Sequence, residues 1–103
     1  MTRVQIVYWR DIPAQVKARD GRQRAARPLS DRFQQAIDEA AMRAGLSGTD
    51  AYLAEWRTSD REERSESPAD AAEATARELE AAYPASRLAS LVAEGGIDRI
   101  TNH

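Results

Sequence analysis

The sequence predicts an α+β domain in which short N-terminal antiparallel β-strands, including a hairpin, are followed by three to four α-helices. Residues 3–9 are rich in β-branched and aromatic side chains, which favour strands. Small apolar and polar residues then alternate over 14–19, up to an Asp-Gly pair typical of a hairpin turn. From residue 30 onward, apolar residues recur at helical spacing. Strands first and helices afterwards indicate an α+β fold rather than alternating βαβ units.

The predicted strands lie within residues 3–28. The first of them is apolar on both faces, so we expect it to be central in the sheet or covered. Asp20 and Gly21 supply the two positive-φ positions of a type I′ turn, and the register that follows places Val16 opposite Ala25. The tip of this hairpin is strongly basic.

The next part of the chain, 30–58, is predicted to form two helices. Ser30 is a good N-cap, and Gly45 supplies a left-handed stop after the apolar residues of the first helix. A capping-box pattern then starts a short second helix, which carries Trp56 and ends near Thr58.

Residues 59–67 contain no apolar side chain and are predicted to form a solvated loop. Residues 68–95 are predicted to form two further helices. Ser67 and Pro68 supply an N-cap and a proline at the first helical position, and Gly95-Gly96 supplies the final stop. Pro84 separates the two helices, because the residue before a proline disfavours the helical region. Residues 96–103 are predicted to be a tail. The whole chain, 1–103, is therefore expected to be a single domain.

Composition excludes several classes of function. The 103 residues include no Cys and a single His, which is the terminal His103. Thiolate metal sites and cysteine nucleophiles are therefore absent, and a terminal histidine lacks the support that a ligand or a general base needs. The sequence also has no glycine-rich nucleotide loop. We expect no catalytic residue, no metal and no cofactor, and an enzyme only where another chain completes the site.

Hydropathy gives an expectation about location. The longest run of large apolar residues is Ile6 to Trp9, far shorter than the roughly 20 residues that cross a bilayer. No stretch has the succession of charged, apolar and small residues typical of a signal peptide. The protein is therefore expected to be cytoplasmic and free of membranes.

Charge divides the chain into two halves. Residues 1–44 hold nine basic and five acidic side chains, a balance of +4, whereas 45–103 hold six and twelve, a balance of −6. The sum is the formal net charge of −2. Patches of one sign attract patches of the other, so the two halves are expected either to pair with each other or to offer opposite faces to two partners.

A first hypothesis is therefore a non-enzymatic accessory protein that contacts a larger protein through its aromatic and charged residues. Aromatic rings beside arginine are typical of interface anchors. Trp9 in particular is predicted to be partly exposed, because the first strand ends beside it. The predicted contact residues are Tyr8, Trp9, Arg10, Asp11, Pro13, Gln15 and Trp56.

Two alternatives remain open. One is a small-ligand or phosphate-binding protein that uses a cluster of Arg22, Arg24, Arg27 and Arg32. The other is a homo-oligomer that buries a helical stripe against a second copy; the stripe consists of Ala72, Ala76, Leu79 and Tyr83. Nucleic acid is disfavoured as a partner, because the pI is about 5.4 and no recognition motif is present.

Three segments carry a resemblance to a known family: 5–16 with Tyr-Trp-Arg-Asp-Ile-Pro, 29–46, and 50–57 with Ala-Tyr-Leu-Ala-Glu-Trp-Arg. Together with Ala-Ala-Tyr-Pro at 81–84, they resemble the bacterial domain family labelled virulence factor. Its members are small stand-alone proteins or modules of larger proteins, which implies an accessory or adaptor role. The resemblance also implies a partner among enzymes of folate- or corrinoid-dependent methyl transfer. It supplies no catalytic residue.

Overall fold

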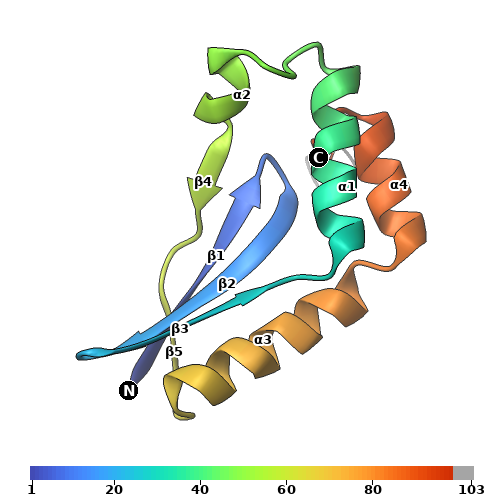
Figure 1. Ribbon diagram of the computed structural model, residues 1–103. Coiled ribbons are helices and arrows are strands. Elements are labelled where there is room, and N and C mark those ends of the chain that lie inside the picture. The colour runs from blue at the N-terminus through green and yellow to red at the C-terminus, as the bar shows by residue number, and fades with distance from the viewer. Residues whose placement is uncertain (99–103) are drawn as a thin grey trace.

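The computed structural model describes residues 1–98 and shows an antiparallel sheet packed against helices (Figure 1). The elements follow in the order β1 (Thr2–Trp9), β2 (Ile12–Asp20), β3 (Gln23–Pro28), α1 (Asp31–Arg43), α2 (Asp50–Ala54), β4 (Trp56–Thr58), β5 (Glu62–Arg64), α3 (Pro68–Ala82) and α4 (Ala85–Ala93). The predicted α+β class is confirmed, with an N-terminal antiparallel sheet followed by helices.

The central position of β1 is also confirmed, since the strand order is β3-β2-β1-β4 and β5 pairs with β1 as well. Two other predictions are wrong: Trp56 begins β4 instead of lying in a helix, and the predicted loop 59–67 contains β5. Both short strands pair with the side of β1 that β2 leaves open, and so supply hydrogen-bond partners to its backbone groups. Between them, Ser59 N–H donates to the carbonyl of Ile6 at 2.9 Å, and Ile6 N–H donates to Ser59 Oγ at 2.8 Å.

The hairpin between β2 and β3 has a different register from the predicted one. Asp20 pairs with Gln23, so Val16 lies opposite Arg27 and not opposite Ala25. Gly21 has a φ of 60°, but the following loop residue does not share the positive sign. A positive φ at the first loop position alone is typical of a type II′ turn, in which glycine takes that position.

The core lies between the sheet and the helices. α3 runs across β1, β2 and β3, and α1 packs against α4 and β2 (Figure 1). The helical stripe predicted to meet a second copy faces this core: Ala72, Ala76 and Leu79 are buried within the chain. Tyr83 is half-buried and packs its ring against the edge of Phe33, with 6.2 Å between centroids. Ala72, Ala76 and Leu79 are therefore not available for contact with a second copy.

The end of the described chain is docked on the turn between β1 and β2. Asp11 N–H donates to the carbonyl of Gly96 at 2.9 Å, and Asp98 N–H donates to Asp11 Oδ2 at 2.6 Å. Residues 96–98 are thus part of the fold and not of the predicted tail. The remainder of that prediction, including His103, lies outside the described residues.

Candidate functional site

The aromatic residue predicted to be partly exposed, Trp9, is fully buried with 0% of its surface accessible. Its indole N–H donates to the carbonyl of Tyr52 at 2.9 Å, and the two rings stack with centroids 5.6 Å apart. The chain makes room for the indole at Gly96, where an added Cβ would lie 2.9 Å from the ring. Trp9 therefore packs the core and has no surface to offer a partner.

Several of its neighbours also hold the fold together. Pro13 is fully buried. Arg10 donates from Nη1 to the carbonyl of Gly95 at 3.0 Å, and its Nη2 lies 3.5 Å from a carboxylate oxygen of Glu55. Trp56 is half-buried at the start of β4, and its ring meets that of Tyr52 edge-on at 6.1 Å. Pro13, Arg10 and Trp56 therefore make their main contacts within the chain.

Tyr8 and Asp11, by contrast, line a groove of about 570 Å³ beside the corner between α3 and α4. The guanidinium of Arg57 lies 4.4 Å from the centre of the Tyr8 ring, and its Nη2 is 3.2 Å from Asp11 Oδ1. Burial and the neighbouring Tyr83 raise the pKa of Tyr8. Two arginines and three aspartates line the groove, so its charges nearly cancel and it offers no unpaired positive charge with which to select an anion.

The predicted arginine cluster is divided between two faces. Arg22 is exposed on the turn and Arg24 is exposed on one face of β3. Arg27 points to the other face, where its Nε lies 2.8 Å from a carboxylate oxygen of Glu73. Arg32 lies 2.9 Å from Glu80 Oε1 and donates to two carbonyls at the end of α3. The cluster does not form, because Arg27 and Arg32 attach α3 to the sheet and to α1.

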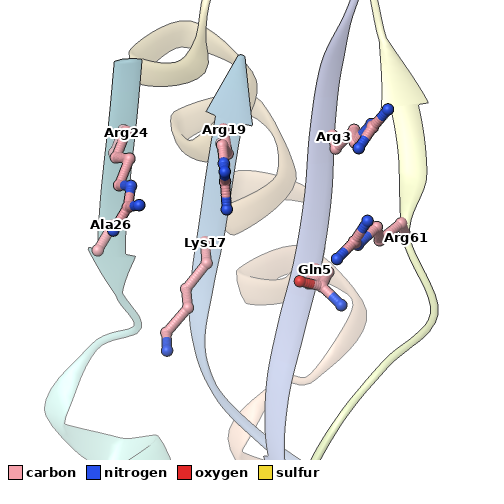
Figure 2. A pocket seen from close by; sticks show the side chains of 9 residues that line it. Arg3, Gln5, Lys17, Arg19, Arg24, Ala26 and Arg61 are labelled. Carbon is pink, nitrogen blue, oxygen red and sulfur yellow. The ribbon is translucent and has the colours of Figure 1, made fainter. Parts of the chain in front are cut away.

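A different group of cations gathers on the uncovered face of the sheet. They line a shallow depression of about 460 Å³ over β1, β2 and β3, and Figure 2 shows their side chains rising from neighbouring strands. We call this surface the basic sheet face; its residues are Arg3, Gln5, Lys17, Arg19, Arg24, Ala26 and Arg61. Within residues 1–98, none of its cations takes part in an ion pair.

The strand register sets like charges opposite one another on this face. Arg3 of β1 pairs with Arg19 of β2, and Arg19 pairs in turn with Arg24 of β3. On the far side of Arg3 lies Glu63 of β5, which is the carboxylate in this row. Like charges directly opposite in a sheet are destabilising. The two arginine pairs of the row therefore oppose folding, and a bound anion would relieve their repulsion.

The cluster predicted from the sequence shares only Arg24 with this face and leaves out Arg3, Lys17, Arg19 and Arg61. Alternation within a strand would have found part of the face, since residues two apart point the same way and residues three apart do not. Arg24 and Arg27 are three apart in β3 and therefore cannot share a face. Arg61 lies between β4 and β5, where no sequence pattern predicted pairing with β1.

Among the described residues, no group of three or more His, Asp or Glu side chains is placed to hold a metal ion. The helices of this part of the chain are all too short or too polar to cross a membrane.

The comparison with known families decides where this fold belongs. The model described as Virulence factor matches residues 7–92, from the end of β1 to the last turn of α4. The chain belongs to the Virulence factor family. The part of the chain that matches this family includes Lys17, Arg19, Arg24 and Arg61 of the basic sheet face, and leaves out Arg3. No curated protein and no solved structure matches this family member.

Proposed function

We propose that this chain is a non-enzymatic accessory protein that binds a larger protein partner through the basic sheet face. The observation that carries the proposal is the row of Arg3, Arg19 and Arg24, in which three exposed cations lie opposite one another without an ion pair in the described chain. A partner that presents carboxylates to this row would remove the repulsion and gain charge-assisted hydrogen bonds.

Protection against aggregation does not account for this row. Arginine on an edge strand commonly keeps sheets from pairing with one another, and this explains Arg24 on β3. Arg3 and Arg19 lie on β1 and β2, which are interior strands. Edge protection therefore does not explain these two charges, whereas binding of an acidic surface would use both of them.

A protein fits this face better than a nucleic acid. No aromatic residue lines the face, so it lacks the rings on which unpaired bases stack. Glu63 and Asp20 border it beside Arg3 and Arg19, where they would repel a continuous phosphate backbone. Family resemblance adds a candidate partner class, the enzymes of folate- or corrinoid-dependent methyl transfer.

The test is affinity purification of the tagged chain from its native host, with the captured proteins identified by mass spectrometry. The R19Q/R24Q double variant neutralises the centre of the basic sheet face. R43Q, which removes an exposed arginine of α1, is the matched control. We expect the wild type and R43Q to recover the same partner, R19Q/R24Q to lose it, and added salt to weaken the capture.

Equal recovery by R19Q/R24Q and the wild type would show that the basic sheet face is not the contact surface. Recovery of no reproducible partner by the wild type would count against the adaptor proposal. Thermal melting with added phosphate then tests the small-anion alternative, since a ligand that binds only the folded chain raises its melting temperature.

A further inference from the structure

β3 forms an edge of the sheet that is open within the described residues. The opposite side of β1 is closed by β4 and β5, whereas β3 has only β2 as a neighbour. α3 packs on the face of β3 and does not pair with its edge. An open edge presents unpaired backbone N–H and C=O groups, which are a template for another strand.

The register identifies the backbone groups that point outward. Leu29 N–H donates to the carbonyl of Ala14 at 3.0 Å, so these opposite residues form a hydrogen-bonded pair. In an antiparallel ladder, hydrogen-bonded and non-hydrogen-bonded pairs alternate. Counting back along the register, Arg24 with Arg19 and Ala26 with Lys17 are therefore non-hydrogen-bonded pairs. The N–H and C=O groups of Arg24 and Ala26 thus face away from β2.

The position of Pro28 agrees with this alternation of hydrogen-bonded and non-hydrogen-bonded pairs. It pairs with Gln15, which the same alternation assigns to the non-hydrogen-bonded class. Proline lacks the N–H that the other class requires, and it is tolerated on an edge strand only where that group would face outward. The open template therefore consists of the two residues Arg24 and Ala26, and Pro28 closes it on one side.

The outward groups lie beside the basic sheet face. The side chains of Arg24 and Ala26 are on that face, next to those of Arg19 and Lys17. A strand added to β3 would place every second side chain on the same face (Figure 2). Carboxylates at those positions would meet the arginines. A second copy of β3 would instead add a second set of arginines to the same face, and the accumulated like charge opposes this pairing.

We propose, on the basis of the binding role above, that an extended acidic segment of the partner adds to β3 as a further strand of the sheet. Backbone hydrogen bonds to Arg24 and Ala26 hold the segment, and its alternate Asp or Glu side chains pair with the basic sheet face. Strand addition of this kind takes affinity from the main chain and specificity from alternate side chains.

The probe is a synthetic peptide of alternating Glu and Val residues, acetylated and amidated, titrated into the ¹⁵N-labelled chain. We expect it to slow hydrogen exchange at the amides of Arg24 and Ala26 by about tenfold or more, because these amides become hydrogen-bonded. A peptide with Gln in place of Glu should bind more weakly. A peptide N-methylated at its Glu residues, whose N–H groups face Arg24 and Ala26 in antiparallel pairing, should lose the protection. The same peptide N-methylated at its Val residues should keep it.

The matched variants are A26P and A26S. A26P removes an N–H that the sheet does not use, so the NMR spectrum of the rest of the chain should stay the same. The affinity for the peptide should fall about tenfold. A26S keeps the N–H and should bind as the wild type does. Binding by A26P equal to that of the wild type, or no protection of the two amides, would overturn strand addition.

The outcomes separate this inference from the function on which it rests. A partner that requires Arg19 but not the Ala26 N–H leaves the basic sheet face as the binding surface and rejects strand addition. Binding that requires neither rejects both proposals. Protection of the same two amides in the peptide-free chain as its concentration rises would assign the edge to a second copy and overturn the acidic segment.

Discussion

The two ends of the β1–β2 hairpin are covered to very different extents. At the turn, Trp9, Ile12 and Pro13 are fully buried. At the other end, Arg3 and Arg19 are exposed side by side. An aromatic residue beside arginine and aspartate suggested a contact surface at the turn, yet Trp9 and Arg10 hold the fold together and Asp11 pairs with Arg57. The binding that we propose is at the other end, where like charges are set opposite one another.

Replacing Trp9 with Ala tests the buried end and should have the largest effect. Loss of a fully buried indole costs about 3–5 kcal/mol of unfolding free energy, which is a large share of the stability of a small domain. Trp56→Ala, the same truncation at a half-buried ring, should cost less. Urea denaturation followed by circular dichroism measures both. Equal losses for the two variants would contradict the assignment of Trp9 to the core.

Glu80→Gln tests the arginines that the structure assigns to the fold. The Glu80 carboxylate accepts hydrogen bonds from Ser30 N–H at 2.7 Å and Ser30 Oγ at 2.8 Å, and it pairs with Arg32. Hydrogen bonds to a charged group contribute more than neutral ones, so the free energy of unfolding of the variant should fall by about 1–2 kcal/mol. Glu39→Gln, at an exposed position of α1, is the control and should change little. A fully stable Glu80→Gln protein would show that this link between α1 and α3 is dispensable.

Acid should weaken the same link. Burial opposes ionisation of Glu80, but the hydrogen bonds from Ser30 and the charge of Arg32 outweigh it and lower the pKa of that carboxyl. A lowered pKa contributes stability that is fully present above the ordinary value near 4.5 and is lost as pH falls through the folded value. Stability should therefore decline below about pH 4.5. The decline should be shallower in Glu80→Gln, and identical acid limbs in the two proteins would contradict this cause.

Arg19→Gln tests the exposed end and should have the smallest effect, with the opposite sign. Removal of the middle cation relieves two like-charge pairs, so unfolding free energy should rise by about 0.2–1 kcal/mol. Arg43→Gln removes a cation from the last turn of α1, where positive charge is favourable, and should give no gain. Thermal melting at low salt measures the difference. A less stable Arg19→Gln protein would mean that the row is not repulsive.

Much of the fold was accessible from local patterns. Pro68 after Ser67 predicted the start of α3, and the side chain of Ser67 does accept from Asp70 N–H at 3.4 Å. The paired glycines predicted the end of α4, and Gly95 and Gly96 both have positive φ. The stretch apolar on both faces predicted that β1 is central. Each of these signals acts over a few neighbouring residues, which is the range that a sequence pattern describes.

The errors arose where distant segments decide the outcome. β4 and β5 are strands because β1 needs partners at its edge, although Glu62 and Glu63 have no strand pattern of their own. Trp9 is buried because Tyr52 and Gly96 converge on it from far along the chain. The basic sheet face depends on the register of several strands. A shift in the register of the β2–β3 hairpin changes which charged residues lie opposite one another. The basic sheet face could therefore not be predicted from the sequence without the correct strand pairing.

The most direct test of an acidic partner on the basic sheet face uses the only lysine of the chain, Lys17, which lies on that face. A zero-length carbodiimide joins an amine to a carboxylate that touches it, and mass spectrometry locates the joined residues. In lysate of the native host, we expect Lys17 to be joined to Asp or Glu residues of one partner protein. K17R keeps the charge, removes the amine and should abolish this product. A partner that copurifies with the wild type but never forms a Lys17 product would contradict the account.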